Sequence, residues 1–334
     1  MFSMSFLRGY KFLACNSTNM SYLTVLRHTL PHIGLYFITG IVFASVSPVA
    51  HADYREFKSI PVNDSLAGAL QQTADASIKE FPQLTGNLAL SVINLTAPKT
   101  PARADYNGDS SFYPASVIKL FFMVEIFRQR KQSPEITRAL QEMIRVSDND
   151  ATAYLVDVIS NTTSGPEFEG KALDEFIDRR RAINRAFASL GYDISAMAKP
   201  WSFGPFGREM QLRGPNRENR NRASANSVAS LLYWIVQRRA ISTEASEAMM
   251  KLLERPLEPT RPDENQVKDF IGEALPKGSK LWSKEGDTSE VRHDTGYIEL
   301  PDGKKFVAVV FTRIGDEKRV LPTVGRHLFE KLSH

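Results

Sequence analysis

The sequence of 334 residues contains a single cysteine, Cys15, and only six histidines. Cys15 and three of the histidines lie within the first 52 residues, which leaves His293, His327 and His334 beyond them. The later part of the chain therefore has no thiol to act as a nucleophile, to form a redox dithiol or to join a Cys/His zinc cluster. No metal and no organic cofactor are expected.

An excess of charge of one sign is also lacking. The chain carries 42 Lys and Arg against 38 Asp and Glu, and residues 1–52 hold three basic residues and no acidic one. The remainder is nearly neutral, and because nucleic-acid-binding proteins normally present a basic face, no nucleic-acid partner is expected. Ordinary contents of glycine (19) and proline (18) exclude collagen-like, low-complexity and wholly disordered chains.

The start of the chain has the layout of an export signal. An uncharged apolar run at 33–46 is preceded by Arg27 and followed by Ala-His-Ala at 50–52. The run is too short to span a bilayer comfortably, and small-x-small is typical of a cleavage site. We interpret residues 1–52 as a secretory signal peptide and 53–334 as the mature chain, exported to the periplasm or the cell exterior, without a membrane span. An uncleaved anchor is the alternative.

Apolar periodicity divides the mature chain into a helical middle and sheet-forming ends. We expect helices at 64–81, 116–130, 135–146, 149–160, 224–238, 243–254 and 320–332, and strands at 88–92, 280–286, 291–300 and 304–312. This order predicts one sheet made by both chain ends, with a helical subdomain inserted at about 120–275. Gly, Pro and Asn throughout 199–223 predict a long ordered loop, and three arginines at 179–181 predict a solvated helix face.

Ser116 and Lys119 open the apolar helix predicted at 116–130, where residues three apart lie on one face. The free N–H groups and positive dipole end of a helix start favour a developing anion. A desolvated lysine can lose its proton and activate a hydroxyl, and a lysine in so apolar a helix needs a partner because burial alone costs free energy. Ser116 is thus a candidate nucleophile, although Ser-x-x-Lys alone is a weak signal.

Two further short motifs are ambiguous when taken alone. Ser-Asp-Asn at 147–149 lies between two predicted helices, where a helix N-cap is the simpler interpretation. Lys-Glu-Gly at 284–286 lies on the first of three C-terminal strands, where a charge pair on an edge strand before a turn is the simpler interpretation.

Together and in this order, Ser-x-x-Lys, Ser-Asp-Asn and Lys-x-Gly are the signature of penicillin-recognising serine enzymes. The chain also resembles class A β-lactamases and the broader β-lactamase-like serine hydrolase family in the stretches YPASVIKLFFMVEIFRQ, MIRVSDNDATAYLVDVI and VRHDTGYIELPDGKKFVAVVFT. The resemblance extends from about Leu66 to Leu332. It implies the α/β (α+β) β-lactamase/transpeptidase-like fold: an antiparallel sheet flanked by helices, an all-helical subdomain, and the active site between them.

The resemblance implies a role for each motif residue. Ser116 attacks the substrate carbonyl, Lys119 takes part in removing its proton, and Ser147 passes a proton to the leaving nitrogen. Asn149 orients Lys119 and a substrate amide. Lys284 supports Ser147 and helps to hold the substrate carboxylate.

The resemblance also implies an oxyanion hole made by the backbone N–H groups of Ser116 and Asp287, directly after Gly286. A different register would align the His-Asp-Thr-Gly sequence at 293–296 with the third motif of the family. That register leaves one strand before the last helix instead of the two that the family has, so we prefer Lys284.

Glu285 departs from the family, which has Thr or Ser there to donate a hydrogen bond to the substrate carboxylate. An ionised Glu285 repels that carboxylate unless it turns away or pairs with Lys284 or Arg292. We expect Arg292 or His293, on the next strand, to restore a cation for the substrate.

The base that hydrolyses the acyl-enzyme is less clearly marked. Class A enzymes use a Glu in a loop after Ser-Asp-Asn, in the pattern Glu-x-x-Leu-Asn, and the loop at 199–223 contains Glu-Met-Gln-Leu-Arg at 209–213. Glu209 is the candidate base and Glu218 a weaker one, while a solvated loop Glu is the simpler interpretation. The short spacing of Ser116 and Ser147 predicts a more open cleft than in ordinary class A enzymes.

Three hypotheses follow. The leading one is an exported, monomeric serine acyl hydrolase that opens small-molecule β-lactams or a related amide through a Ser116 acyl-enzyme. The second is a D,D-peptidase acting on cell-wall peptides, or an esterase, with the same serine. The third is a catalytically idle module that binds cell-wall peptides, against which the complete set of five motif residues argues.

Overall fold

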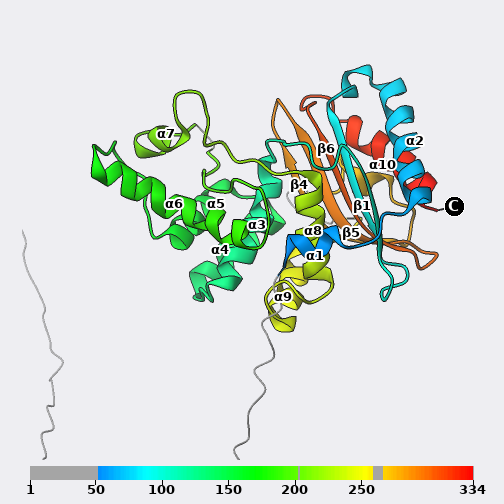
Figure 1. The fold of residues 1–334 in the computed structure, drawn as a ribbon, viewed down its shortest axis with the longest axis horizontal. Coiled ribbons are helices and arrows are strands. Elements are labelled where there is room, and N and C mark those ends of the chain that lie inside the picture. The colour runs from blue at the N-terminus through cyan, green and yellow to red at the C-terminus, as the bar shows by residue number, and fades with distance from the viewer. Residues whose placement is uncertain (1–51, 202–203, 259–265, 334) are drawn as a thin grey trace, which may run out of the picture. The chain divides into compact units, whose positions relative to one another are not determined.

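The computed structural model describes residues 52–201, 204–258 and 266–333 (Figure 1). The apolar run of the leader lies outside these residues, so the signal peptide stays a prediction. Within the described ranges, no helix combines the length and the apolar character that crossing a bilayer requires.

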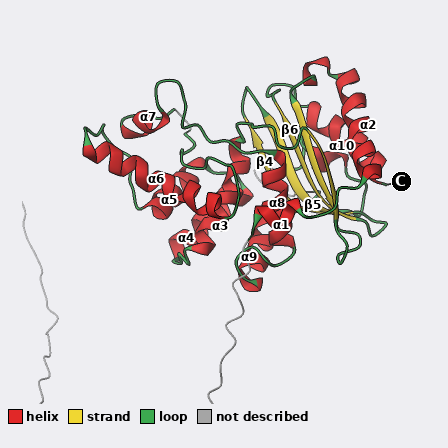
Figure 2. Ribbon diagram, in the orientation of Figure 1, coloured by secondary structure: helices red, strands yellow, loops and turns green. Residues whose placement is uncertain are grey.

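The described strands form one antiparallel sheet in the order β2-β1-β6-β5-β4-β3 (Figure 2). They are β1 (Leu88–Asn94), β2 (Ala102–Tyr106), β3 (Glu254–Arg255), β4 (Lys280–Asp287), β5 (Arg292–Glu299) and β6 (Lys305–Thr312). β1 pairs with β6, with Leu88 opposite Thr312. The sheet is therefore built from both ends of the chain, as expected, and the α/β β-lactamase/transpeptidase-like fold class is confirmed.

Helices cover both faces of this sheet. α2 (Asp64–Glu80) and α10 (Val320–Leu332) pack together on one face (Figure 1), where Leu70 and Leu328 share an apolar core with Leu90 and Val310 of the strands. α8 (Ala225–Val236) contacts β1, β5 and β6 from the other face. All residues of α8 from Ala225 to Ile235 are buried, and most of them are apolar, which is typical of a helix inside the core.

Of the remaining described helices, one precedes α2 in the chain, five lie between β2 and α8, and one follows α8. They are α1 (Tyr54–Lys58), α3 (Lys119–Arg128), α4 (Pro134–Arg145), α5 (Asn149–Ser160), α6 (Lys171–Ser189), α7 (Arg208–Arg213) and α9 (Thr243–Leu253). α3, α4 and α5 pack on one another, and Phe121 and Met143 are among the residues that they bury completely. Helix α3 is thereby held between the helical region and the sheet.

Three expectations about local structure were wrong. The segment 199–223 is not all loop, because it contains α7, whose flanking residues Gly207 and Gly214 both have positive φ. The arginine run is not a wholly solvated face, since Arg180 of α6 is only 1% exposed. The apolar helix begins at Lys119 rather than at residue 116.

Candidate active site

The candidate nucleophile Ser116 lies on a tight turn, the short 3-10 helix Ala115–Ile118, which leads directly into α3. Ala115 has a φ of 45°, a left-handed conformation that is uncommon for a residue with a side chain. Such strained conformations are found preferentially at functional sites. The Ser116 side chain is half-buried and lines a cavity.

Strand β4 packs directly against this turn at Gly286. A Cβ atom on Gly286 would lie 2.8 Å from the backbone nitrogens of both Ser116 and Val117, closer than side chains approach backbone. Only glycine allows this approach. Asp287, the next residue, lines the same cavity as Ser116.

Lys119 is completely buried at the start of α3. Its Nζ donates to the backbone oxygen of Ser147 (2.6 Å), to Ser147 Oγ (3.1 Å) and to Asn149 Oδ1 (3.0 Å). Burial, and then the charge of Lys284, lower the pKa of Lys119 to about 7. Near neutral pH a substantial fraction of Lys119 is therefore unprotonated, as a base for a hydroxyl group requires.

The Ser-Asp-Asn motif performs two tasks. Asp148 is the N-cap of α5 and its side chain accepts a hydrogen bond from Ala151 N (2.6 Å), as the simpler interpretation of the motif expects. Ser147 adopts a left-handed φ of 59° just before this cap. In this conformation both oxygens of Ser147 accept hydrogen bonds from Lys119. Asn149, in the first turn of α5, accepts a hydrogen bond from the same lysine.

Lys284 of β4 is also completely buried, and its Nζ donates to Ser147 Oγ (2.9 Å). Two lysines from elements far apart in the sequence thus meet at one serine hydroxyl. Neither Ser147 nor Lys284 lines the described cavity directly, and both are connected to it through Lys119.

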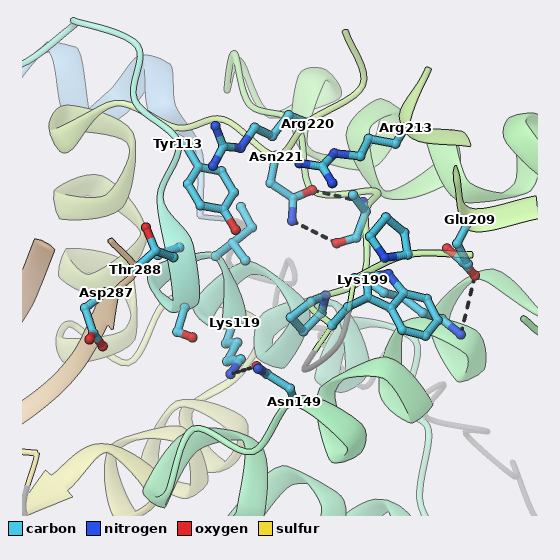
Figure 3. A pocket seen from close by; sticks show the side chains of 18 residues that line it. Tyr113, Lys119, Asn149, Lys199, Glu209, Arg213, Arg220, Asn221, Asp287 and Thr288 are labelled. Carbon is cyan, nitrogen blue, oxygen red and sulfur yellow. Dashed lines mark hydrogen bonds and ion pairs between the residues drawn. The ribbon is translucent and has the colours of Figure 1, made fainter. Parts of the chain in front are cut away.

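The cavity has a volume of about 260 Å³ (Figure 3). Its lining includes Ser116, Lys119 and Asn149. It also includes Asp287, the last residue of β4, and Thr288, which follows the strand. The structure therefore brings residues of the first two motifs, and the residue that follows the third, to one cavity. The catalytic roles of these residues remain predictions.

The Glu285 side chain does not point into the cavity, where it would repel a substrate carboxylate. Its side chain is buried and forms an ion pair with Lys284, with 2.5 Å between Oε1 and Nζ. It is not among the described residues that line the cavity. The sequence left open whether Glu285 turns away from the substrate or pairs with Lys284 or Arg292. The structure shows that it turns away and that its partner is Lys284.

Arg292 and His293, the expected sources of a cation for the substrate, are not among the described residues that line the cavity. Arg292 is 6% exposed and donates from Nε to the backbone oxygen of Gly315 (3.2 Å). His293 accepts at Nδ1 from Thr312 N (3.1 Å) and lies with Nε2 2.8 Å from the carbonyl oxygen of Tyr113. Burial lowers the pKa of His293 to about 4, so at neutral pH it is an uncharged link between β5 and the residues before Ser116.

Glu209 lines the cavity from α7, but its carboxylate already has partners. Oε1 lies 2.5 Å from Arg180 Nη2, 3.1 Å from Ser164 Oγ and 3.6 Å from Lys199 Nζ. Within the described part of the chain it forms no hydrogen bond or ion pair with Ser116. Figure 3 shows Glu209 beside Lys199, on the opposite side of the view from Asp287 and Thr288.

The sequence analysis missed the cations of the cavity wall. Lys199, Arg213 and Arg220 line the cavity. Arg220 stacks on the ring of Tyr113, with 3.6 Å between its Cζ and the ring centroid, and pairs with Glu290 at 2.8 Å. In the sequence these residues are marked only by the high arginine content of the segment 199–223. No fixed spacing links that segment to the three motifs, so the sequence did not place these cations at the site.

The fold and the three motifs define a β-lactamase-like serine enzyme. The model of the beta-lactamase enzyme family, Beta-lactamase2, matches residues 69–139 and 130–332. The chain therefore belongs to the beta-lactamase enzyme family, and its enzyme class is a serine hydrolase of the β-lactamase type. No curated protein sequence matches it.

Solved structures support the same fold. PBP-A is 19% identical, with 82% of this chain and 99% of that chain covered and a TM-score of 0.56. A beta-lactamase from Sphaerobacter thermophilus is 20% identical, with 79% and 98% covered and a TM-score of 0.55. The TLA-1 extended-spectrum beta-lactamase is 13% identical, with 80% and 100% covered and a TM-score of 0.55.

Proposed function

We propose that this chain is a serine acyl hydrolase that opens β-lactams, or a related amide, through an acyl-enzyme on Ser116. The observation that carries the proposal is the meeting of two buried lysines at Ser147 Oγ, at 3.1 and 2.9 Å. Burying two ammonium groups side by side costs free energy, and such perturbed groups cluster at functional sites. The leader supports an exported location, periplasmic or extracellular.

In the proposed first step, unprotonated Lys119 accepts the proton of Ser116 as its oxygen attacks the carbonyl carbon. The intermediate collapses by breaking its C–N bond, and Ser147 gives its proton to the leaving nitrogen. Ser147 regains a proton from the protonated Lys119, whose Nζ lies 3.1 Å from Ser147 Oγ, and Lys119 returns to its unprotonated form. Since Lys119 and Lys284 both donate to Ser147 Oγ, the serine O–H is left to donate to a third group.

The negatively charged oxygen of the intermediate needs hydrogen-bond donors that stabilise it. The backbone N–H groups of Ser116 and Asp287 are the proposed pair, and the close packing at Gly286 supports this, because it sets β4 against the turn of Ser116. Asn149 holds Lys119 by a 3.0 Å hydrogen bond and is the proposed contact for a substrate amide.

The pKa of Lys119 predicts how acylation depends on pH. The second-order rate constant for acylation should rise with pH, with a midpoint near 7, because the pKa of Lys119 is about 7 and only the unprotonated amine accepts the Ser116 proton. Above that pH the rate should reach a plateau, which ends at the alkaline pH where Lys284 loses its proton. Adduct formation measured from about pH 5.5 to about pH 9 tests this. A flat profile, or one that rises only at the alkaline end, contradicts Lys119 as the base.

A D,D-peptidase or esterase with the same serine is the second candidate, and the surroundings of Glu209 favour it. The ion pairs of Glu209 with Arg180 and Lys199 occupy the carboxylate that would activate the deacylating water. One solved structure of similar fold is a PBP-A variant described as an acyl-enzyme complex with penicillin G. A long-lived adduct is the corresponding outcome for this chain.

The intact mass of the mature protein, followed over time after mixing with benzylpenicillin, separates these functions. An adduct that disappears as hydrolysed drug accumulates indicates a β-lactamase. A lasting adduct indicates a peptidase-like enzyme, which hydrolysis of a D-alanyl peptide or an ester would then confirm. No adduct with either class of substrate overturns the proposal and favours a binding module.

A further inference from the structure

The ion pair between Lys284 and Glu285 has no counterpart in the family motif and no task in the steps above. Lys284 Nζ contacts Glu285 Oε1 (2.5 Å), the backbone oxygen of Glu285 (3.0 Å) and Ser147 Oγ (2.9 Å). An ammonium group has three hydrogens to donate. All three therefore have an acceptor, and Glu285 provides two of them.

Arg255 gives a physical reason for a carboxylate at this position. It is 5% exposed, and its Nη2 lies 4.0 Å from Glu285 Oε2. Each oxygen of the Glu285 carboxylate thus faces a buried cation, Lys284 on one side and Arg255 on the other. Without the carboxylate these two positive charges would repel each other in a poorly solvated environment.

The other charged groups nearby do not replace this carboxylate. Asp294 lies opposite Glu285 on β5 and is completely buried. Burial, and then the charge of Glu285, raise the pKa of Asp294 to about 8, so it is mostly protonated at neutral pH. Lys119 adds positive charge when protonated, and Asp287, at the exposed end of β4, has Arg292 3.6 Å away.

We propose that Glu285 is a positioning residue for acylation: its carboxylate keeps Lys284 charged and aims the ammonium group at Ser147. This inference rests on the proposed function. Burial lowers the pKa of Lys284, and Glu285 provides the largest opposing effect. A charged Lys284 in turn lowers the pKa of Lys119, whereas the charge of Glu285 raises it, so the role of Glu285 lies in placing Lys284 rather than in tuning the base.

The test measures acylation by benzylpenicillin as a function of pH for Glu285→Gln and Glu285→Asp. Glu285→Gln should react about tenfold more slowly at neutral pH. Its rate should also begin to fall at a lower alkaline pH than the rate of the parent, because Lys284 loses its proton more easily without the charge of Glu285. Glu285→Asp keeps the charge but shortens the side chain, so it should retain the pH profile of the parent at a lower rate.

A matched control is Glu299→Gln, which removes a carboxylate from the far end of β5. Glu299 pairs with Lys305 (3.0 Å) and does not line the cavity. This variant should match the parent in rate and in pH profile. If Glu285→Gln fails to fold, Glu285→Asp decides the question, because a parent-like rate in that variant contradicts a role in aiming Lys284.

The variant Glu285→Thr distinguishes the positioning role from the repulsion of the substrate carboxylate that the sequence alone predicts. Repulsion of the substrate carboxylate by Glu285 predicts a higher apparent affinity for penicillin in the variant, whereas the positioning role predicts slower acylation. Faster acylation, or a Glu285→Gln variant with the rate and pH profile of the parent, overturns the positioning role alone. A parent protein that forms no adduct overturns the proposed function, and this inference with it.

Discussion

Replacement of Ser116 by alanine should give a folded protein that forms no adduct with benzylpenicillin. In the proposed mechanism the oxygen of Ser116 is the atom that becomes acylated. Within the described residues the Ser116 hydroxyl has no hydrogen-bond partner, and its side chain is half-buried, so its removal should change the free energy of unfolding by less than about 0.5 kcal/mol. Intact mass measures the adduct, and thermal unfolding measures the fold.

Ser111→Ala is the matched control, because Ser111 is an exposed serine five positions earlier in the same segment. It should be acylated at the rate of the parent. An adduct that persists in Ser116→Ala, mapped to Ser147 or to any other serine, would show that the nucleophile has been assigned to the wrong residue.

Replacement of Glu209 by glutamine should destabilise the protein by about 3 kcal/mol. Glu209 and Arg180 are both almost completely buried, and the change removes the negative charge 2.5 Å from the guanidinium group. Breaking a buried ion pair by removing one partner leaves the other charge uncompensated, and Asp157, 3.1 Å from Arg180, compensates only in part. Urea unfolding monitored by circular dichroism measures the loss. The exposed ion pair of Glu175 with Lys171 provides the control, Glu175→Gln, with an expected effect below about 0.5 kcal/mol.

The same variant decides whether Glu209 also activates the deacylating water. If it does, Glu209→Gln accumulates an acyl-enzyme that the parent clears. If the carboxylate only stabilises Arg180 and Lys199, both proteins release the acyl group at the same rate under conditions in which both are folded. Unchanged stability in Glu209→Gln would contradict the ion-pair cluster itself.

Four of the described strands could be predicted because apolar alternation and turn residues are local signals, whereas the strand order, β2 and the two-residue β3 could not. The strands expected at 280–286 and 304–312 correspond to Lys280–Asp287 and Lys305–Thr312. Likewise, the motif residues could be predicted to come together, since a short motif and its place in the chain order are visible in the sequence, although Ser147 and Lys284 do not line the cavity.

Burial of charge could not be predicted in the same way, because it depends on partners far away in the chain. Arg180 lies in a run of three arginines, and only the fold shows that Asp157 and Glu209 surround it. The orientation of the Glu285 side chain depends on the position of Arg255, which lies at the end of the two-residue strand β3. No periodicity or motif contains that information.

The pairing of the first strand with the last has a consequence for synthesis of the chain. β1 needs β6 as its neighbour, and the turn of Ser116 needs Gly286, so a nascent chain carries its nucleophile long before the strand that supports it. Pairing between segments so far apart is slow compared with local contacts. A product that stops before β4 would contain Ser116, Lys119 and Ser147 and still lack an assembled catalytic centre. If the proposed mechanism holds, the chain therefore becomes competent for catalysis only after translation is nearly complete.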